Sequence, residues 1–546
     1  MTSARRLRVV LVHPPAASTP TLRAEEAVPP LGLAYVAAAA RQAGHSVQVV
    51  DAVGEGLERF SVFDAGRRII LRGLPAEEIT SRIPEDANVI GLSCMFSGAW
   101  RPNRALIEHV KRARPRARIV LGGEHATACH EHILATCASV DFCVLGEGEE
   151  TFCRLLQAIA EGSADAPPPG VASRGRSGPA AAAVATLPPT QRRPRVRDIH
   201  AIAEPAWDLF PLERYLDGGY AHGVTRGRTM PILASRGCPY QCTFCSSPNM
   251  WTTKWVARRP RDVLEEMKRY QQRYGAGDFA FYDVTAIVDR RWIVEFCGLV
   301  LDEDLRITWQ LPSGTRSEAI DAAVAELLYR SGCHNLDYAP ESGAPSVLRR
   351  IKKRVDLDRM VRSIRDAVAA GLEVKVNFII AFPDETLGEI RQTIRLAARL
   401  ARLGVEAVGL FAFCPYPGSE LFDDLLARGK IRLDDAYFDA MVATDAARIV
   451  SYNRHLDATQ LFTLSMGARA AFYAIQLLTH PSRVLRLASE MARGARTSKT
   501  AKGFEAMRMR RRAWRVLSGE AAARGDCGRV LQDVADARRD LAMPDQ

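Results

Sequence analysis

Two long stretches of this chain, residues 7–158 and 230–413, alternate short apolar runs with helical patterns, and this alternation constrains the fold more than any other feature. Runs of about four to eight apolar residues between turn signals are typical of buried strands. Parallel strands need a long crossover connection, usually a helix, so the alternation predicts parallel sheets covered by helices. A chain of 546 residues is also too long for one core, and several domains are expected.

The first stretch predicts a Rossmann-like parallel sheet domain over residues 1–158. Its expected strands are residues 7–12, 46–50, 89–93, 119–121 and 142–145, and a helix is expected over residues 31–43. Ligands of such sheets bind at the carboxyl ends of the strands. The candidate ligand-binding residues at those ends are His13, Pro14, Ser93, Met95, Gly122, Gly123, His125, Gly146 and Glu147. No GxGxxG turn is present, which disfavours a nicotinamide cofactor.

The second stretch predicts six strand–helix units, a partial (β/α)6 TIM-type barrel within residues 216–448. The expected strands are residues 230–234, 278–282, 307–311, 335–339, 374–382 and 407–413, and the expected helices are residues 260–274, 292–301, 318–329, 357–370 and 386–402. The chemistry of such barrels lies at the carboxyl ends of the strands. Residues 159–215 are expected to be a linker with a possible hairpin, and residues 449–546 a helical extension.

Cys238, Cys242 and Cys245 form a CxxxCxxC triplet directly after the first expected barrel strand. Three thiolates at this spacing can hold three irons of a cubane cluster and leave the fourth iron open for chemistry. A structural zinc site usually needs four ligands, and no second CxxC or HxxxH motif lies nearby. The other nine cysteines are scattered, and small buried core residues are the default interpretation for them.

The triplet, with Phe244 before its last cysteine, resembles the signature of the radical SAM superfamily. The upstream domain resembles the cobalamin-binding domain of one large subfamily, which includes the anaerobic magnesium-protoporphyrin cyclase and cobalamin-dependent C-methyltransferases. This second resemblance rests on four segments: Pro-Pro-Leu-Gly-Leu at residues 29–33, Ser93, Gly-Gly-Glu-His-Ala-Thr at residues 122–127, and Gly-Glu-Gly-Glu-Glu-Thr at residues 146–151. The DxHxxG motif of enzymes that bind cobalt through histidine is missing.

The resemblance implies three cofactors: a 4Fe-4S cluster on the triplet, S-adenosylmethionine on the open iron, and cobalamin on the sheet domain. Expected contacts of S-adenosylmethionine are Phe244, Asp283, Ser313, Arg316, Glu341 and Ile380. Phe244 and Ile380 are expected to flank adenine, whereas Glu341 could instead cap the next helix and Arg316 could form a structural salt bridge. Ala381 stands where relatives usually have glycine. No catalytic residue is singled out.

These cofactors together predict radical cleavage of S-adenosylmethionine and cobalamin-dependent methyl transfer to an unactivated carbon of a small-molecule substrate. Oxidative cyclisation or rearrangement without net methylation is the alternative reaction, and a non-catalytic cobalamin or redox sensor is the alternative class. An electron donor such as flavodoxin or ferredoxin is expected. Nucleic acid is not expected as a partner, because no recognisable RNA-binding motif is present.

The formal charge of +11 is modest, but basic residues concentrate between residues 483 and 515. A solvated helical face is the first interpretation, and contact with an acidic partner such as an anionic membrane surface is the second. No run approaches the roughly 20 apolar residues of a membrane span, so no transmembrane segment is expected. Twelve cysteines without secretory features predict a cytoplasmic protein.

Overall fold

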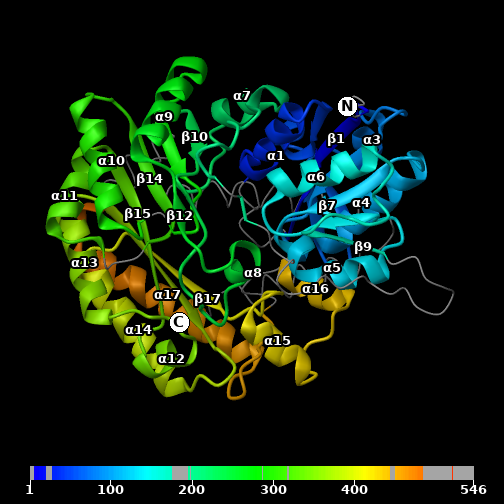
Figure 1. Cartoon of the computed structure of the whole chain (residues 1–546). Helices are drawn as coiled ribbons and strands as arrows, with labels where there is room; N and C mark the ends of the chain where they lie inside the picture. Colours follow the sequence, from blue (N-terminus) through cyan, green and yellow to red (C-terminus); the bar gives the residue numbers. More distant parts are fainter. Residues whose placement is uncertain are drawn as a thin grey trace.

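Two large, mainly parallel sheets form most of the molecule, each with helices packed on it (Figure 1). The structure, a computed structural model, describes residues 5–19, 27–174, 195–196, 198–285, 287–315, 319–442, 449–483 and 519. The predicted α/β fold class, with a Rossmann-like domain, a partial barrel and a helical C-terminal region, is confirmed.

The first sheet has the strand order β3-β1-β6-β7-β8-β9. Its parallel strands are β1 (Arg8–His13), β3 (Ser46–Asp51), β6 (Val89–Ser93), β7 (Arg118–Gly122) and β8 (Phe142–Val144). The order reverses between β1 and β6, and such a switch point is where open α/β sheets bind ligands. Helices α1 (Leu31–Gln42) and α6 (Gly148–Ala160) cover one face, and α4 (Trp100–Ala113) and α5 (Glu124–Thr136) cover the other.

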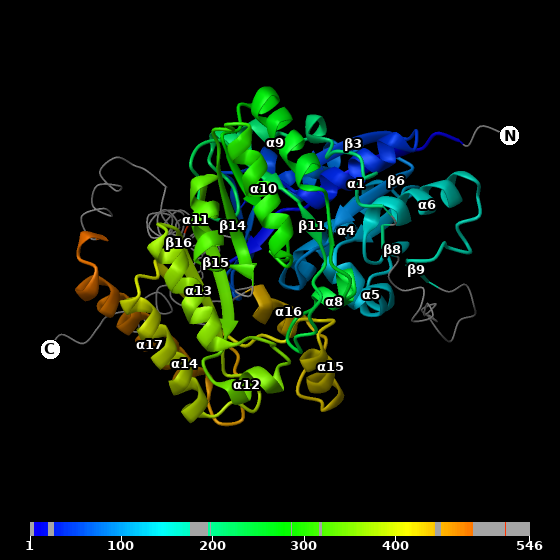
Figure 2. The same ribbon diagram turned by 60° about the vertical axis from the view of Figure 1, so that its left-hand side comes forward.

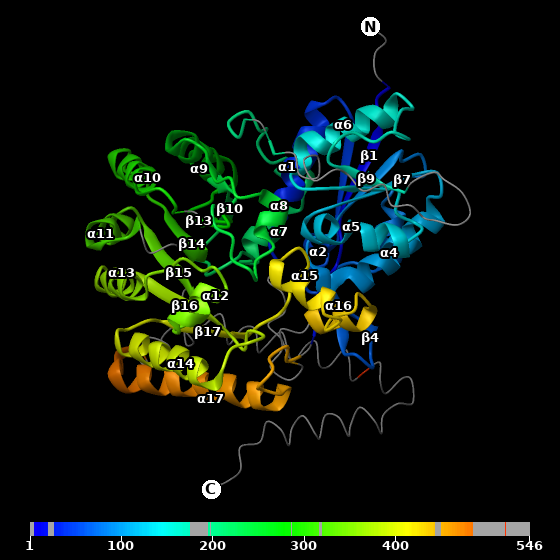
Figure 3. The same ribbon diagram turned by 60° about the horizontal axis from the view of Figure 1, so that its bottom comes forward.

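The second sheet is parallel throughout, in the order β10-β13-β14-β15-β16-β17. These strands are β10 (Thr229–Ile232), β13 (Asp278–Phe281), β14 (Thr308–Thr315), β15 (Cys333–Glu341), β16 (Glu373–Ile380) and β17 (Ala407–Ala412). The connecting helices are α9 (Pro260–Tyr274), α10 (Arg290–Asp302), α11 (Ala322–Arg330), α13 (Leu357–Ala369) and α14 (Leu387–Arg402). They form an arc on the outside of the sheet (Figure 3), so the six predicted barrel strands are confirmed, joined by five helices into a partial barrel.

Several short strands escaped prediction. β2 (Ala16–Ser18), β4 (Phe60–Asp64) and β5 (Ile69–Arg72) form a small antiparallel sheet, and β9 (Val171–Ser173) adds an antiparallel edge to the first sheet. Strands of three to five residues carry too little periodicity to be recognised from sequence. β14 and β15 also run further than expected, because register shifts carry their pairing into the strand-end residues.

Helix α17 (Ala458–Thr479) covers the last barrel strand and packs on α14 (Figure 2). Ser465 Oγ donates to Leu410 O at 3.3 Å, and Gln476 Nε2 donates to Val405 O at 2.7 Å. These bonds cover one carbonyl of the edge strand β17 and one just before it, which would otherwise be open. Among the described residues, α17 alone is long and apolar enough to span a membrane, by length and composition only. Of the basic segment at residues 483–515, only Arg483 lies within the described residues, where it donates to Val405 O.

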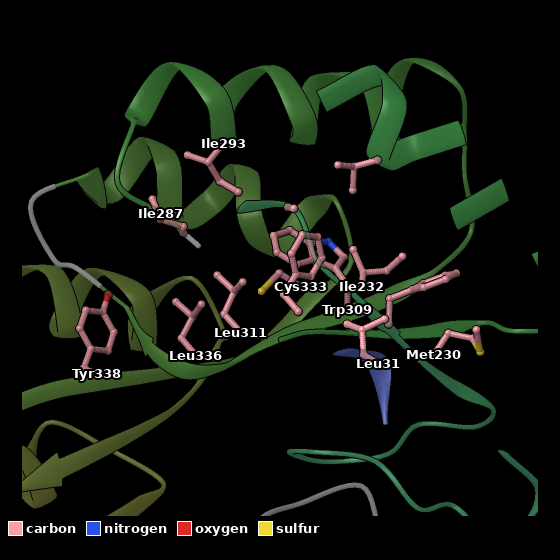
Figure 4. Packing of buried hydrophobic residues seen from close by; sticks show 14 of the residues in the cluster. Leu31, Met230, Ile232, Ile287, Ile293, Trp309, Leu311, Cys333, Leu336 and Tyr338 are labelled. Carbon is pink, nitrogen blue, oxygen red and sulfur yellow. The ribbon is translucent and has the colours of Figure 1, made fainter. Parts of the chain in front are cut away.

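The core runs without a break from the first sheet into the barrel. Leu31 at the start of α1 belongs to the same buried cluster as Met230 and Ile232 of β10, and Trp309 and Leu336 continue the cluster into the barrel (Figure 4). The two sheets are therefore held against each other by apolar packing as well as by polar contacts.

Candidate functional site

The cysteine triplet lies on a loop that begins at a two-residue strand, β11 (Ser235–Arg236), paired antiparallel with β12 (Val256–Ala257). Gly237 leaves β11 with φ +86°, and a Cβ there would lie 2.2 Å from Lys254 O. Any larger residue would clash with the β12 side of the hairpin, so glycine is required just before Cys238. This explains why the triplet follows Arg-Gly.

The three cysteines are half-buried on one loop, and none of them forms a disulfide. Cys245 N donates to Cys242 O at 3.1 Å, and Ser247 N points at Cys245 Sγ at 3.4 Å. Thr243, between the second and third cysteines, donates to Ile351 O at 3.0 Å and accepts from Leu421 N at 2.8 Å. The loop is therefore fixed to the barrel on two sides.

These thiols suit a cubane cluster. Burial raises the pKa of Cys245 to about 12, so the free thiol is neutral at pH 7 and would lose its proton on binding iron. No group of three His, Cys, Asp or Glu side chains in the described part of the chain is placed to hold a single metal ion. A cubane distributes its three cysteine ligands over three irons, so its ligands need not converge on one point.

Asp283 is buried beneath the start of the cluster loop. Its carboxylate accepts from Ala234 N at 3.0 Å and from Ser235 Oγ at 2.5 Å. Burial raises the pKa of Asp283 to about 6. Asp283 was predicted to contact S-adenosylmethionine, but both of its oxygens accept hydrogen bonds from the protein, and it is 1% exposed. In this structure it positions the residues that lead into the loop.

Glu341 ends β15 with φ +64°, a left-handed conformation that costs a non-glycine residue about 1–2 kcal/mol. Its Oε1 lies 2.9 Å from Lys353 Nζ, and it does not cap the next helix, α12 (Pro345–Arg350), whose N-cap is Ala344. Backbone strain of this kind gathers at functional sites, because the surrounding structure must hold it in place. Glu341 therefore stays a candidate ligand residue, paired with Lys353.

The expected adenine pair needs a correction. Phe244 is half-buried and its ring lies 5.7 Å from that of Phe382, but Ile380 is completely buried in the barrel core. Ile379, one residue earlier, packs with the cluster that holds Phe244. Successive strand residues point to opposite faces of the sheet. A residue that faces the core is therefore followed and preceded by residues that face the site.

The structure says little about the two remaining expected contacts of S-adenosylmethionine, Ser313 and Arg316. Ser313 is half-buried on β14, whereas Arg316 lies outside the described residues. Ala381 has φ +63°, and this explains why glycine is usual at its position. The constraint at this position is therefore on the backbone conformation.

Sequence reasoning missed a set of charged side chains on the barrel strands. Lys375 Nζ lies 3.2 Å from Asp337 Oδ2, and Asn377 Nδ2 donates to the same carboxylate at 3.4 Å. Asn377 Oδ1 is buried without a hydrogen-bond partner among the described residues. The signal was available in the alternation of polar and apolar residues from Glu373 to Phe378 of β16, because the apolar residues there are buried and the polar ones are half-buried.

At the switch point of the first sheet, Met95 and Phe96 follow β6 and are 44% and 64% exposed. Exposed apolar side chains at a strand end are typical of a ligand-binding surface. Gly122 ends β7 with open space where a Cβ would stand, whereas Gly123 has φ +108° and a Cβ there would lie 2.8 Å from Cys94 O. These features suit the flat, largely apolar face of a corrin, and Ser93 lies half-buried beside them.

His13 lies at the end of β1 and its Nδ1 is 2.8 Å from Asp51 Oδ1. Tyr215 of α7 (Leu212–Asp217) donates to the same carboxylate at 2.9 Å, and Asp51 is completely buried. A carboxylate on Nδ1 fixes the ring and directs Nε2 away from it. The neighbouring Pro14 is buried and packs in the turn.

His125 is not placed to touch a ligand at the sheet edge, contrary to expectation. It is completely buried, with Nδ1 2.9 Å from Ser97 Oγ and its ring packed against Trp100 and Phe438. Burial lowers the pKa of His125 to about 3, so the ring is neutral. Its role in this structure is packing beneath the strand ends.

Glu147 also has a different position from the one expected. It is 3% exposed and pairs with Arg236 of the cluster-loop strand at 3.1 Å and with Arg195 at 2.9 Å. Glu149 pairs with the other nitrogen of Arg236 at 2.6 Å. The Gly-Glu-Gly-Glu segment therefore holds the two domains together at the base of the cluster loop.

Thr127 makes a second connection between the domains. Its Oγ1 accepts from Gly146 N at 3.0 Å, donates to Gly123 O at 2.8 Å, and lies 3.6 Å from Met250 Sδ. Met250 belongs to α8 (Ser247–Trp251), the short helix after the triplet, which lies between the two sheets (Figures 1 and 3). The cluster loop and the carboxyl ends of the first sheet are thus adjacent.

Comparisons with known proteins agree with this architecture. Residues 19–156 match the B12 binding domain family, and residues 232–397 match the Radical SAM superfamily. An uncharacterized methyltransferase of Pyrococcus horikoshii is 28% identical over 425 residues, which cover 78% of this chain and 84% of the relative. The cytidylyl-2-hydroxyethylphosphonate methyltransferase of Streptomyces wedmorensis is 27% identical over 457 residues, covering 80% and 84%.

Among solved structures, the fold is similar to that of the radical S-adenosylmethionine methyltransferase TsrM from Kitasatospora setae, which holds cobalamin and a [4Fe-4S] cluster. The TM-score is 0.59 at 16% identity, and the match covers 86% of this chain and 89% of TsrM. At this identity the likeness describes the fold.

Proposed function

Because the chain belongs to the radical SAM enzymes that carry a B12-binding domain, we propose that it transfers a methyl group from cobalamin to an unactivated carbon of a small-molecule substrate. The observation that carries the proposal is the contact between the two domains. Arg236, two residues before the first cysteine, is held by Glu147 and Glu149 at the strand ends of the B12-binding domain. A substrate between the domains would meet both cofactors.

Each cofactor has a candidate set of residues. Cys238, Cys242 and Cys245 would hold a 4Fe-4S cluster, and this cluster would supply one electron that cleaves S-adenosylmethionine to methionine and a 5′-deoxyadenosyl radical. Glu341 and Phe244 would line the place of S-adenosylmethionine. The exposed Met95 and Phe96, with Gly122 and Gly123, would support cobalamin, which would supply the methyl group.

The protein's own part is to position these groups and to keep water away from a radical. Asp283 holds Ala234 and Ser235, and Gly237 makes the turn into the loop, so the ligand residues start from a fixed point. Preorganisation of this kind places reacting atoms without a cost at the moment of reaction. We place this chemistry in the cytoplasm, where an electron donor would reduce the cluster.

Anaerobic reconstitution with iron and sulfide, followed by measurement of 5′-deoxyadenosine, tests the radical step. Cys242→Ala should abolish both cluster absorbance and 5′-deoxyadenosine formation, whereas Cys153→Ala, which removes a half-buried thiol of the other domain, should keep both. A fully loaded wild-type protein that leaves S-adenosylmethionine intact would favour the sensor alternative.

Methylation itself needs a separate measurement. The visible spectrum of protein purified with hydroxocobalamin would report cobalamin binding. S-adenosylmethionine with a deuterated methyl group would then label a product only if a methyl group is transferred. A product formed with 5′-deoxyadenosine but without the label would favour cyclisation or rearrangement.

A further inference from the structure

Helix α17 contains no acidic residue and leaves one apolar face exposed to solvent. Met466, Leu477 and Leu478 on this apolar face are 42%, 43% and 83% exposed. The exposed residues between them are all small: Gly467, Ala470, Ala471 and Ala474. The one base of the helix, Arg469, is half-buried and donates to Leu410 O, so it is turned toward the barrel. An exposed apolar face of this length is typical of an interaction surface.

Helix α14, which packs beside α17, exposes a row of arginines (Figures 2 and 3). The row is formed by Arg391, Arg395, Arg399 and Arg402, and all four are exposed. Residues three or four apart lie on one side of a helix, so the four charges face the same way. The only acidic residue of α14, Glu389, is bound to Arg350, and no ion pair of the four arginines is found within the described residues.

Acidic groups at the ends of α17 do not balance this charge. Glu406, beneath the C-terminal end of the helix, is buried and already pairs with Arg483 at 3.3 Å. Asp457 caps the start of α17, at the opposite end of the helix from Leu478. The sequence after Arg483 continues with further basic residues. The apolar face and the arginine row together, here called the α14–α17 surface, therefore carry a positive charge.

The contacts of α17 with the barrel decide how the helix could meet a membrane. It is long and apolar enough to cross one, but its inner face is held by the barrel. Ser465, Arg469 and Gln476 donate to backbone carbonyls of β17 and of the residues just before it. A helix anchored in this way can lie along a membrane surface but cannot pass through the membrane.

We infer that the α14–α17 surface binds an anionic membrane surface, which goes beyond the proposed function and does not depend on the reaction. Anionic lipid headgroups would pair with the arginine row, and the apolar face would enter the boundary between headgroups and acyl chains. Two copies of the protein that met through this surface would bring two arginine rows together. The repulsion between these rows favours a membrane over a second copy.

Flotation with lipid vesicles tests this inference on the full-length, reconstituted protein. Vesicles of phosphatidylcholine alone are compared with vesicles in which about one third of the lipid is phosphatidylglycerol, which supplies the negative surface. Three variants address the surface: R391E/R395E/R399E reverses the arginine row, R391Q/R395Q/R399Q removes its charge, and L477E/L478E places charge on the apolar face.

Each charge change has a matched control elsewhere on the molecule. R112E/R116E/R330E reverses three exposed arginines that belong to neither α14 nor α17. Y329E is the control for the apolar face, because Tyr329 is 43% exposed, like Leu477, but lies on α11. All of the changed side chains are exposed, so every variant should keep the urea midpoint and the rate of 5′-deoxyadenosine formation of the wild type in solution.

We expect the wild type to float with the anionic vesicles and to bind phosphatidylcholine vesicles at least about tenfold more weakly. R391E/R395E/R399E and L477E/L478E should each reduce the affinity for anionic vesicles about tenfold or more, and the glutamine variant should lose less than the reversal. Both controls should change the affinity less than about twofold. An increase of the ionic strength from about 0.01 to about 0.1 M should weaken wild-type binding, because the Debye length shortens from about 30 to about 10 Å.

Four results would overturn the inference. The wild type could fail to bind anionic vesicles, or R112E/R116E/R330E could lose as much affinity as the reversal of the arginine row, which would reduce the effect to overall charge. Unchanged binding by L477E/L478E would remove α17 from the contact. A wild-type dimer in light scattering that L477E/L478E abolishes, without vesicle binding, would assign the apolar face to a second copy. Vesicle binding is measured without S-adenosylmethionine, so a failure of the proposed function would be seen separately.

Discussion

Arg236 Nη2 and Glu149 Oε1 lie 2.6 Å apart in a buried contact between the cluster loop and the B12-binding domain. Glu147 binds the other terminal nitrogen of the same guanidinium, and the rings of Tyr35 and Trp251 lie 5.2 and 5.8 Å from its central carbon. An arginine that is fully desolvated needs this set of partners. The contact fixes the relative position of the two cofactor-binding regions at one point.

Glu149→Gln should lower the free energy of unfolding by about 3 kcal/mol, because loss of one partner leaves buried charge uncompensated. Urea unfolding, followed by fluorescence, would measure the change. Asp86→Asn, which breaks the exposed ion pair with Arg8, is the control and should cost less than about 1 kcal/mol. Equal costs for the two variants would show that the buried contact does not hold the domains.

Gly122 and Gly123 make a matched pair at the end of β7. Gly123→Ala should destabilise the protein by about 1–2 kcal/mol or more, because φ is +108° and the new methyl group would lie 2.8 Å from Cys94 O. Gly122→Ala meets nothing within 4 Å, so the cofactor-free protein should keep its stability. If cobalamin fills that open space, Gly122→Ala should still weaken binding of hydroxocobalamin, as measured by its visible spectrum.

A separate outcome would contradict each of these two predictions. A Gly122→Ala protein that binds hydroxocobalamin like the wild type would move the corrin away from the end of β7. A Gly123→Ala protein that is as stable as the wild type would contradict the left-handed conformation itself.

Asp283→Asn should make the protein's stability less dependent on pH. The folded pKa of Asp283 is about 6, above its ordinary value of 3.8, because burial penalises the carboxylate. Its favourable contribution is therefore complete below about pH 4 and is lost as the pH rises through about 6. Between pH 4 and pH 7 this lost contribution amounts to a free energy of unfolding on the order of 3 kcal/mol. The effect of Asp283→Asn on the free energy of unfolding should therefore be more favourable at pH 7 than at pH 4 by that amount. Urea unfolding of both proteins at the two pH values would measure it.

Asp321 offers a control with the opposite sign. It caps α11 by accepting from Val324 N, and this hydrogen bond is the main cause that lowers the pKa of Asp321. The Asp321 carboxylate therefore stabilises the fold above its ordinary pKa, and this stabilisation is lost as the pH falls through its lowered folded pKa. Asp321→Asn should therefore cost stability at pH 7 and little at low pH. The same pH dependence in both variants would contradict the assignment for Asp283.

The strand–helix alternation was enough to predict both sheets, because each strand is a local apolar run whose partner follows by a right-handed crossover. The expected bounds of β6 and α9 agree with the structure residue by residue. Side-chain direction at strand ends was less predictable. Ile380 was expected beside Phe244, yet Ile380 is buried in the barrel core, whereas the half-buried Ile379 packs against the same cluster as Phe244, because β16 alternates faces at every residue.

Contacts between the domains could not be predicted from local patterns. Glu147 and His125 stand at strand ends, where ligands bind, but Glu147 is used by Arg236 and His125 is buried between Trp100 and Phe438. Apart from Trp100, these partners are far away in the chain. Which side of a turn faces another domain depends on how the two domains pack together. The hydrophobic periodicity of a local segment carries no information about that packing.

Phe96→Ala should weaken cobalamin binding without changing the stability of the cofactor-free protein. Phe96 is 64% exposed at the switch point, so its removal should change the free energy of unfolding by less than about 0.5 kcal/mol. If a corrin covers this ring, the lost apolar contact should reduce the affinity about tenfold, as measured by titration with hydroxocobalamin. Leu478→Ala removes an apolar side chain that is 83% exposed on α17, and it should change neither quantity. A Phe96→Ala protein with wild-type affinity would place the corrin elsewhere on the sheet edge, away from the end of β6.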